Sequence, residues 1–525
     1  MNSDFQTLPE LSTKQAAFKA NEVALIYEDE FFTYGQLDEN SNRVAQGLLK
    51  LDLSPEARVA ILAKDSLASY ETLFGCAKSN TVLVTINWRL VAQEVLFILN
   101  DSQTEVLFVG AEFLPLVNQI KPDLPKVKTI VVIEPTDTTT THQDYTAWKG
   151  QQPNQLPSLD YRPEDVVVQI YTSGTTGLPK GVQLAHYSFF RLMQGMQAQE
   201  DAWMDLNDRD TLLLSLPMFH IGGLWWVIQG MIAGGRGVVL NTFVPWRALE
   251  LIAQYQITKV AMVPAMIQFC MAEPTFDTTD FSSVQGFLYG GSPIAPALLR
   301  RAMDAFQCGF FQIYGMTETG NMAVCLRPED HDLANETRLK AAGKPLPGVE
   351  VKVTDPAGEL LPTGQIGEIC IKSPSRMIGY WNRAEANEET LIDGWIRTGD
   401  AGYQDEEGYI FVCDRVKDMI IYAGENLFPA EIEAVLSEHE AIAEVAVIGV
   451  PNEQWGETPK AFVVQKPGYQ LKRKEIIAFA KERMADFKVP RSVTFVEKLP
   501  RNPSGKVLKR ILRDPYWNAM ERQVN

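Results

Sequence analysis

Apolar residues in the first part of the chain follow two alternating patterns. Short apolar runs at residues 21–32 and 57–63 predict a hairpin and a strand. Apolar positions spaced three or four apart at residues 33–51 and 66–79 predict amphipathic helices. Strands and helices in alternation are typical of an open α/β sheet.

The same pattern returns in the middle of the chain and then changes. Further strands are predicted at residues 211–216, 259–263, 286–289 and 309–314. From Gly348 the apolar period becomes two, and a turn sequence, Asp-Pro-Ala-Gly-Glu, separates the runs. Period two with short turns predicts antiparallel strands that form a small β-barrel.

The last hundred residues have a pattern of their own. A charged stretch at residues 414–418, DRVKD, precedes a mixture of helical and strand patterns. We predict a large N-terminal domain at residues 1–413, a hinge at 414–417 and a small mobile α+β domain at 418–525. The predicted fold class is α/β, with open sheets and a small antiparallel barrel in the large domain.

One apolar segment, residues 212–235, contains no Asp, Glu, Lys or Arg and is long enough to cross a bilayer. Pro217, His220, Gln229 and the pair Gly222 and Gly223 interrupt it. Such interruptions favour a strand, a turn and a buried helix over a membrane span.

Length and charge narrow the class of protein. At 525 residues the chain exceeds the size of one hydrophobic core. A net charge of −18 argues against nucleic acid or an anionic membrane as the main partner. From Lys460 onward, however, 16 basic residues stand against 6 acidic ones. This basic piece suits an anionic partner, although a solvated surface explains it equally well.

The six cysteines are widely scattered, with no Cys-x-x-Cys pair and no histidine at zinc-site spacing. We expect them to be reduced and mostly buried, which indicates a cytoplasmic protein. The first residues, MNSDFQTLPELSTKQ, lack the apolar core of a signal peptide. The sequence allows a homodimer but does not predict the oligomeric state.

The most informative stretch is a predicted strand at residues 166–171 followed by TSGTTGLPKG. Glycines let backbone N–H groups converge on an anion, while the hydroxyl groups and Lys180 add donors and positive charge. These features suit a polyphosphate, although such a composition also fits a mobile linker. The spacing is not that of a Walker loop.

Five further motifs carry candidate chemistry. LPMFHIGG contains His220, YGGSPIAP follows a strand end where open sheets bind nucleotides, and RTGDAGY contains Asp400, a candidate ribose ligand. IYGMTETG contains Glu318, which suits Mg²⁺ held by one carboxylate, water and substrate oxygens. LPRNPSGKVLKR presents Lys506 on a turn. Each motif alone also fits an ordinary core residue, cap or turn.

Together, in this order, the six motifs resemble the adenylate-forming superfamily of acyl- and aryl-CoA ligases, peptide-synthetase adenylation domains and luciferases. The resemblance runs from the early YGQLDENSNRVA to Lys506. It implies ATP, Mg²⁺ and a thiol, either CoA or the phosphopantetheine of a carrier protein. It also implies that Lys506 is the mobile catalytic lysine, Lys417 the hinge, and His220 the gate to a thiol tunnel beside Gly424.

The resemblance assigns the other site residues as well. Glu318 would hold the metal, and Thr317 would contact the α-phosphate. The expected nucleotide ligands are Thr172, Ser173, Gly174, Thr175, Thr176, Gly177, Lys180, Gly291, Ser292, Pro293, Tyr314, Gly315, Asp400 and Arg415. The expected acyl pocket includes Phe219, Trp225, Val263, Gly290, Met316, Gly320 and Asn321.

The implied activity is ATP-dependent conversion of a carboxylic acid to an acyl adenylate with pyrophosphate release, followed by thioester formation with the pantetheine thiol of CoA. The pocket is apolar and has no carboxylate that could bind the amino group of a substrate, which disfavours amino acids as substrates. A fatty acid is favoured slightly over an aromatic one. Alternatives are a ligase that loads an acyl carrier protein, a luciferase-like oxygenase and a non-catalytic ATP-binding relative.

Overall fold

The computed structural model describes residues 5–134, 142–172, 178–199, 203–423, 425–452, 454–501 and 507–517. The chain divides into two compact units, Met1–Val351 with Ile371–Arg397, and Lys352–Cys370 with Thr398–Asn525. The chain passes from one unit to the other within three strands of the antiparallel region. The predicted hinge at residues 414–417 stays a prediction.

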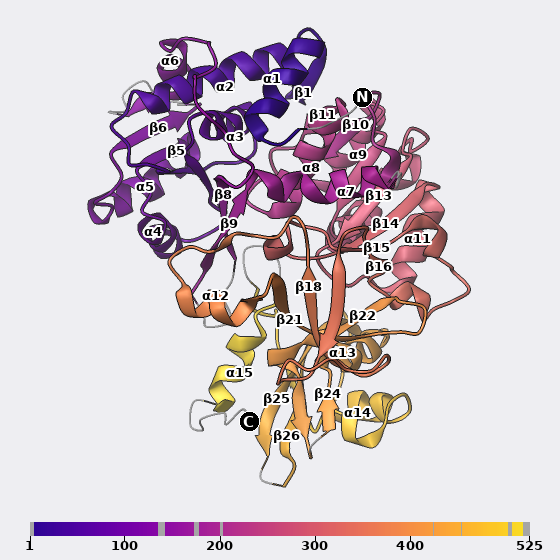
Figure 1. The fold of residues 1–525 in the computed structure, drawn as a ribbon. Coiled ribbons are helices and arrows are strands. Elements are labelled where there is room, and N and C mark those ends of the chain that lie inside the picture. Colours follow the sequence, from indigo (N-terminus) through magenta and orange to yellow (C-terminus); the bar gives the residue numbers. More distant parts are fainter. Residues whose placement is uncertain are drawn as a thin grey trace. The chain divides into compact units, whose positions relative to one another are not determined.

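The first unit contains two large sheets (Figure 1). In order across the first sheet, the strands are β16 (Lys344–Pro345), β15 (Val324–Leu326), β14 (Gly309–Tyr314), β13 (Gly286–Gly290), β12 (Lys259–Met262), β10 (Thr211–Leu214), β11 (Arg236–Val239), β1 (Val23–Tyr27) and β2 (Glu30–Thr33). In order across the second, they are β19 (Gly379–Tyr380), β9 (Lys180–Ala185), β8 (Val166–Thr172), β4 (Val82–Thr85), β3 (Arg58–Leu62), β5 (Val106–Gly110), β6 (Thr129–Ile133) and β7 (Gln143–Asp144).

Most strand pairs inside these sheets are parallel, as the alternation of strands and helices predicts. From β14 to β1 every neighbouring pair is parallel, and so is every pair from β8 to β7. The strands are almost entirely buried because helices cover the faces of parallel sheets. The predicted hairpin is β1 and β2, and the predicted α/β class is confirmed.

Capping residues and prolines mark where several helices of the first unit begin. They are α1 (Leu8–Lys19), α2 (Tyr34–Leu49), α3 (Leu67–Lys78), α4 (Ala92–Asp101), α5 (Leu114–Ile120), α6 (Tyr145–Gly150), α7 (Arg191–Ala198), α8 (Ile221–Ala233), α9 (Pro245–Gln254), α10 (Pro264–Ala272), α11 (Pro296–Phe306) and α12 (Ala384–Thr390). Thr33 caps α2 through a capping box with Gln36, which satisfies two backbone N–H groups. Four of these helices have proline in the first turn after a capping residue in extended conformation, where its missing N–H costs little.

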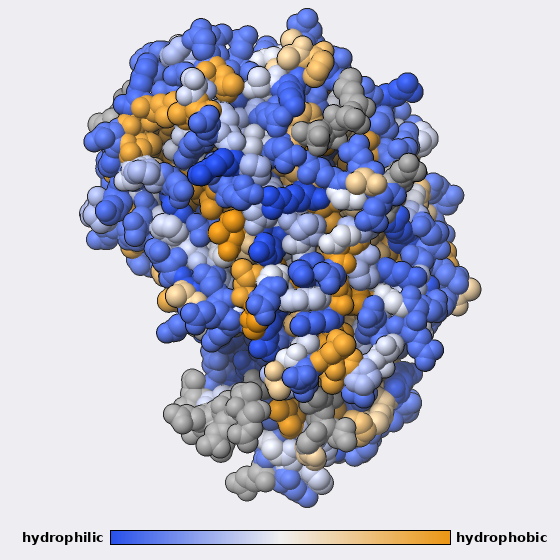
Figure 2. Space-filling view, viewed as in Figure 1, coloured by the Kyte–Doolittle hydropathy of each residue, from blue (hydrophilic) through white to orange (hydrophobic). Residues whose placement is uncertain are grey.

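The apolar segment at residues 212–235 forms the predicted strand, turn and buried helix, β10 and α8. Among the helices that the structure describes, none combines the length and hydropathy needed to cross a membrane. Hydrophilic residues cover most of the face shown in Figure 2, with apolar side chains in scattered groups. All six cysteines are free, four of them buried, as expected.

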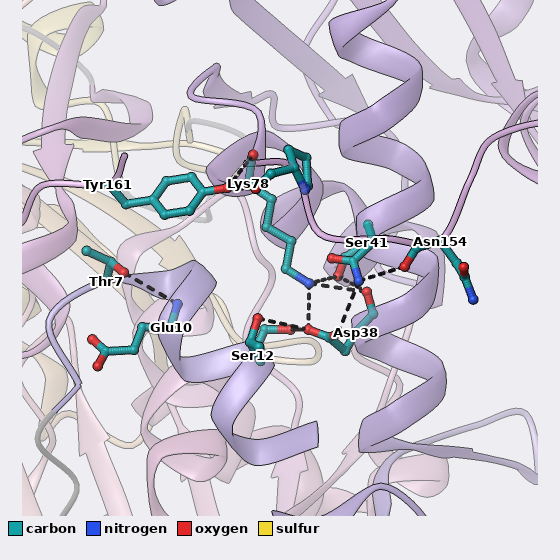
Figure 3. Close-up of polar contacts among 11 residues, drawn as sticks. Thr7, Glu10, Ser12, Asp38, Ser41, Lys78, Asn154 and Tyr161 are labelled. Atoms are coloured by element: carbon teal, nitrogen blue, oxygen red, sulfur yellow. Dashed lines mark hydrogen bonds and ion pairs between the residues drawn. The ribbon is translucent and has the colours of Figure 1, made fainter. Parts of the chain in front are cut away.

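Helices α1, α2 and α3 pack on one another around a buried lysine (Figure 3). The ammonium group of Lys78 is fully buried and donates to Asp38 Oδ1 at 2.6 Å, to the Asp38 carbonyl at 3.2 Å and to Ser41 Oγ at 2.8 Å. Asp38 also accepts hydrogen bonds from Ser12 and Asn42. Every N–H of Lys78 therefore has a partner within the protein.

The second unit has a smaller mixed sheet and helices of its own. Across the sheet the strands are β24 (Glu425–Leu427), β23 (Ile420–Tyr422), β26 (Gly456–Gln465), β25 (Ile442–Asn452) and, beside β26, β27 (Ser492–Phe495). Its helices are α13 (Pro429–Ser437), α14 (Arg473–Lys481) and α15 (Lys509–Trp517). Residues of α13, α14 and the strands bury a common apolar core, which includes Ile432, Val447 and Ile476.

The antiparallel region consists of β17 (Glu350–Thr354), β18 (Gly367–Lys372), β20 (Leu391–Ile392), β21 (Trp395–Gln404) and β22 (Ile410–Arg415). Period two correctly predicts these strands. The described strands pair in the order β17, β18, β21, with β20 and β22 both beside β21, and closure into a barrel stays a prediction. Period two fixes which faces alternate but not whether the last strand returns to the first.

Candidate active site

The predicted acyl and nucleotide residues of the first unit follow the carboxyl ends of neighbouring parallel strands. His220 comes after β10, Val263 after β12, Gly290 ends β13, and Met316 follows β14. The carboxyl ends of parallel strands lie at one edge of a sheet, which is where open α/β folds bind ligands. The chain order of the strands therefore gathers residues that are a hundred positions apart.

The carboxyl ends of the second sheet meet this edge at two places. Thr172, at the end of β8, lies with its hydroxyl 3.5 Å from Glu318 Oε1. Asp65, which follows β3, accepts the backbone N–H of Met218 at 3.0 and 3.3 Å. The candidate active site lies where the two sheets face each other.

Glu318 is a buried residue whose carboxylate and backbone are both held by hydrogen bonds. Tyr380 donates its hydroxyl to Glu318 Oε1 at 2.9 Å, and the Met377 N–H donates to the Glu318 carbonyl at 2.8 Å. Its neighbour Thr317 is also buried, in the same short helical turn. A fixed carboxylate beside a hydroxyl is a suitable ligand for one Mg²⁺ whose other ligands are water and phosphate.

The predicted phosphate loop joins two paired strands. Thr172 pairs with Lys180 in the antiparallel ladder of β8 and β9, so the loop leaves and returns at one place. Lys180 Nζ lies 4.9 Å from the centroid of the Tyr380 ring. Ser173, Gly174, Thr175, Thr176 and Gly177 lie outside the described residues. The described ends of the loop fit a polyphosphate beside Glu318.

The turn at residues 315–321 is fixed by its own hydrogen bonds and by one glycine. Thr319 Oγ1 accepts the Met316 N–H and donates to the Met316 carbonyl, both at 2.9 Å. Gly320 has φ +80°, and a Cβ there would lie 2.2 Å from the Ser375 carbonyl oxygen. Only glycine tolerates both conditions, so the chain can turn sharply and bury Asn321.

Three of the predicted nucleotide ligands occupy a more open loop. Gly291, Ser292 and Pro293 are exposed between β13 and α11, and Gly291 has φ +78°. Tyr314 ends β14, and Gly315 begins the turn that leads to Glu318. These five residues lie at the same sheet edge as Glu318, while their contacts with a nucleotide stay a prediction.

His220 caps α8 in a tightly packed turn. Its N–H donates to the Pro217 carbonyl at 3.0 Å, and its ring lies 4.6 Å from the ring of Phe219. Burial and the nearby Arg89 lower the pKa of His220 to about 4, so the imidazole is neutral at pH 7. A neutral ring is easier to hold among apolar groups than a charged one.

Asp65 holds the backbone of this turn through the N–H of Met218. Burial raises the pKa of the Asp65 carboxyl to about 7, although the Met218 N–H and Arg89 oppose the rise. Asp65 lies beside a cavity of about 10 Å³ that Thr85, Met218 and Phe219 also line. This volume holds one water molecule. Asp65 is a positioning residue for the backbone that carries Phe219 and His220.

The predicted acyl residues divide into two groups. Phe219, Gly320 and Asn321 are buried, and Val263, Gly290 and Met316 are half-buried at the strand ends. Trp225 lies deeper, on α8, where its ring packs against Trp203 at 5.7 Å. Contact between these residues and an acid stays a prediction.

In the second unit the structure pairs two predicted residues. Asp400 and Arg415 face each other on β21 and β22, with Arg415 Nε 2.8 Å from Asp400 Oδ1. Arg415 also donates to the Thr398 carbonyl at 3.3 Å. Lys417 lies two residues further on, and burial lowers its pKa. Gly424 and Lys506 lie outside the described residues.

Two residues of the site escape sequence analysis, Tyr380 and Asp65. Each lies far along the chain from the residue that it contacts, Glu318 or Met218. Tyr380 stands in a short GYWN stretch, and Asp65 lies next to Ser66, the N-cap of α3, where small polar residues are common. Neither setting carries a signal of function in the sequence.

Comparisons with known proteins agree with this geometry. Residues 12–381 match the family model described as AMP-binding enzyme, and residues 431–506 match the AMP-binding enzyme C-terminal domain. The chain is similar to fatty acid–[acyl-carrier-protein] ligase ScoC of Streptomyces coeruleorubidus, with 45% identity over 99% of this chain and 98% of that one. It is also similar to long-chain-fatty-acid–CoA ligase FadD13 of Mycobacterium tuberculosis, with 35% identity over 92% and 93%.

A solved structure gives the same result. The anthranilate CoA ligase AuaEII in complex with anthranoyl-AMP superposes with a TM-score of 0.86 and 28% identity, covering 98% of each chain. Fold, strand-end residues and sequence similarity along nearly the whole length thus agree. The chain belongs to the AMP-binding enzyme family.

Proposed function

We propose that the protein activates a hydrophobic carboxylic acid with ATP and transfers the acyl group to a thiol. One observation carries the proposal. Thr172 and Lys180, at the two ends of the phosphate loop, lie around the buried Glu318 and its partner Tyr380. The similarity to adenylate-forming ligases supports the same chemistry.

In the first step a carboxylate oxygen of the acid attacks the α-phosphorus of ATP. A bond forms between that oxygen and phosphorus, and the bond to the β-phosphate oxygen breaks, which releases pyrophosphate. The loop and Lys180 bind the β- and γ-phosphates, and Thr317 orients the α-phosphate. Mg²⁺ held by Glu318 would neutralise charge on the phosphate oxygens. Lys506 brings carboxylate and α-phosphate together.

In the second step a thiol attacks the carbonyl carbon of the acyl adenylate and AMP leaves. Lys506 must withdraw to let the thiol approach, so we propose that the C-terminal domain turns about Lys417 and presents Gly424 instead. Neutral His220 separates the thiol path from the acyl site. Asp400 and Arg415 hold the ribose during both steps.

The acceptor is the finer part of the proposal. The relative with 45% identity is named for an acyl carrier protein, whereas that with 35% identity is named for CoA. We therefore propose the phosphopantetheine thiol of an acidic carrier protein, with CoA as the alternative. The basic residues after Lys460 suit either anionic partner. The six free cysteines support a cytoplasmic location.

The experiment is a panel of carboxylic acids assayed for pyrophosphate release, with CoA and a phosphopantetheinylated carrier protein offered separately. We expect release that depends on the acid, and thioester on the carrier protein. Thioester formation on CoA alone would refute a carrier protein as the acceptor. Cleavage of ATP to ADP would refute the proposed reaction.

A further inference from the structure

Asn321 carries a buried polar group that the protein leaves without a partner. The side chain is 8% exposed, and its amide nitrogen has no hydrogen-bond partner among the described residues. An unpaired buried donor is costly and is rarely retained without use. The backbone of Asn321 also has φ +92°, which is uncommon for a residue other than glycine. The fold holds this amide in place at a cost.

The amide lies against the first turn of α8. A Cβ at Gly222 would be 3.9 Å from Asn321 Oδ1 and 3.5 Å from Leu216 Cδ1, so the glycine leaves room for about one more atom between them. The amino end of this 13-residue helix carries partial positive charge, which favours an electron-rich atom. His220, neutral at pH 7, caps the same turn. The amide group of Asn321 and the amino end of α8 therefore flank a small space in an otherwise apolar region.

We propose that Asn321 and the first turn of α8 bind an oxygen atom in the tail of the acid, remote from its reacting carboxylate. This inference rests on the proposed function, because it gives the class of acid that is activated. The preferred substrate is a hydrophobic acid with one hydroxyl, keto or ether oxygen, rather than a plain hydrocarbon chain. Asn321 is the residue that determines this preference.

The apolar surroundings favour a neutral oxygen over a second carboxylate. Glu318 lies in the same turn, whose backbone closes through the hydrogen bond from the Asn321 N–H to the Met316 carbonyl. Burying a second carboxylate in an apolar pocket would cost far more than burying a neutral oxygen. A site built to hydrogen-bond a substrate oxygen rejects the analogue that lacks it, because the donor is then left unpaired.

The experiment compares pairs of acids of equal length, one saturated and one with a hydroxyl or keto group at successive positions. Pyrophosphate release gives kcat/KM for each acid, and equilibrium dialysis gives binding of each acid without ATP. We expect one oxygenated isomer to be preferred at least tenfold by the wild type. Asn321→Gly, which suits the positive φ but removes the amide, should abolish that preference in both assays.

A second variant approaches the same space from the helix. Gly222→Ala places a methyl group at ordinary contact distances, so the protein should fold while the oxygenated acid loses more kcat/KM than the saturated one. Asn42→Ala and Gly150→Ala are the matched controls, at a buried asparagine of α2 and at an open glycine of α6, and should keep the wild-type preference.

The outcomes separate the two proposals. If no acid releases pyrophosphate, the proposed function fails, while dialysis still tests Asn321. If acids are activated or bound but no oxygenated isomer is preferred by the wild type, or if Asn321→Gly and Gly222→Ala keep the preference, the role of Asn321 is wrong.

Discussion

Two regions of the first unit bury polar side chains almost completely, and they differ in whether the buried donor groups at their centre have acceptors. Around Lys78 all three ammonium hydrogens have acceptors, and Asp38 receives further donors from Ser12 and Asn42 (Figure 3). Around Glu318 the neighbouring Asn321 keeps an amide nitrogen without a partner.

The difference separates a structural ion pair from a binding site. A buried charge whose hydrogen bonds are all filled by the protein has nothing to offer a ligand and serves to fix three helices together. A buried donor that stays unfilled has been retained at a cost, which a ligand can repay when it binds. The following variants test this comparison, in order of their expected effect on pyrophosphate release.

Lys506→Ala should have the largest effect. The lysine stabilises charge on the α-phosphate only during adenylation, so its loss should slow pyrophosphate release by on the order of 10²-fold or more. Thioester formation from preformed acyl adenylate should remain close to that of the wild type. Rapid-quench assays of each half-reaction measure both, and equal losses in the two would contradict a role in one step.

Glu318→Gln should slow pyrophosphate release by about 10²-fold, because an amide cannot supply the charge that Mg²⁺ requires. The thermal unfolding midpoint should not fall, since glutamine still accepts the Tyr380 hydroxyl in a buried setting. Raising the Mg²⁺ concentration should recover part of the lost activity. A large fall in the unfolding midpoint would show that Glu318, like Lys78, stabilises the fold, and would contradict a role in binding alone.

Lys78→Met should lower the stability of the fold and leave turnover unchanged. Methionine fills the space of the lysine stem but leaves Asp38 without its cation, so we expect a loss of about 2 kcal/mol in the free energy of unfolding. The hydrogen bonds from Ser12 and Asn42 keep the loss moderate. Among molecules that remain folded, turnover should match the wild type, as measured by urea denaturation beside initial rates.

The pH dependence of that variant supplies an internal check. Burial lowers the pKa of folded Lys78 to about 8, whereas the unfolded chain keeps its proton to about 10.5. The unfolded state therefore binds more protons in this interval, and wild-type stability gains a rising contribution from pH 8 to 10.5. Lys78→Met should lack that contribution, and an unchanged pH profile would argue against a buried ammonium group.

Asp65→Asn should have the smallest effect on turnover, because the asparagine oxygen can still accept the Met218 N–H. Its effect is on stability. Burial raises the folded pKa to about 7 from the ordinary 3.8, so the folded state keeps a proton that the unfolded state has lost. Wild-type stability therefore acquires a falling contribution from about pH 4 to 7, which the variant should lack. Urea denaturation across this range measures it.

Much of the architecture follows from patterns in the sequence. The strand ends that carry His220, Gly290 and Glu318 were predictable because apolar runs stop where glycine-rich motifs begin. The contact between Thr172 and Glu318 was not, since it joins two sheets across 146 positions of chain. Periodicity describes one element at a time and cannot pair one sheet edge with another.

The same limit of periodicity explains which features the sequence did not predict. Tyr380 and Asp65 act through partners that only the tertiary structure brings near. Whether the antiparallel strands close into a barrel depends on where the last strand ends, which the alternation of side chains does not record. Asn321 was recognisable as a polar residue in an apolar pocket, but its unpaired amide required coordinates.

The most direct test is exchange of labelled pyrophosphate into ATP in the presence and absence of the acid. If the meeting of the two sheets is an adenylation site, exchange will require the acid, fall steeply in Glu318→Gln and persist in folded Lys78→Met. Exchange that proceeds without any acid, or that survives Glu318→Gln unchanged, would contradict it.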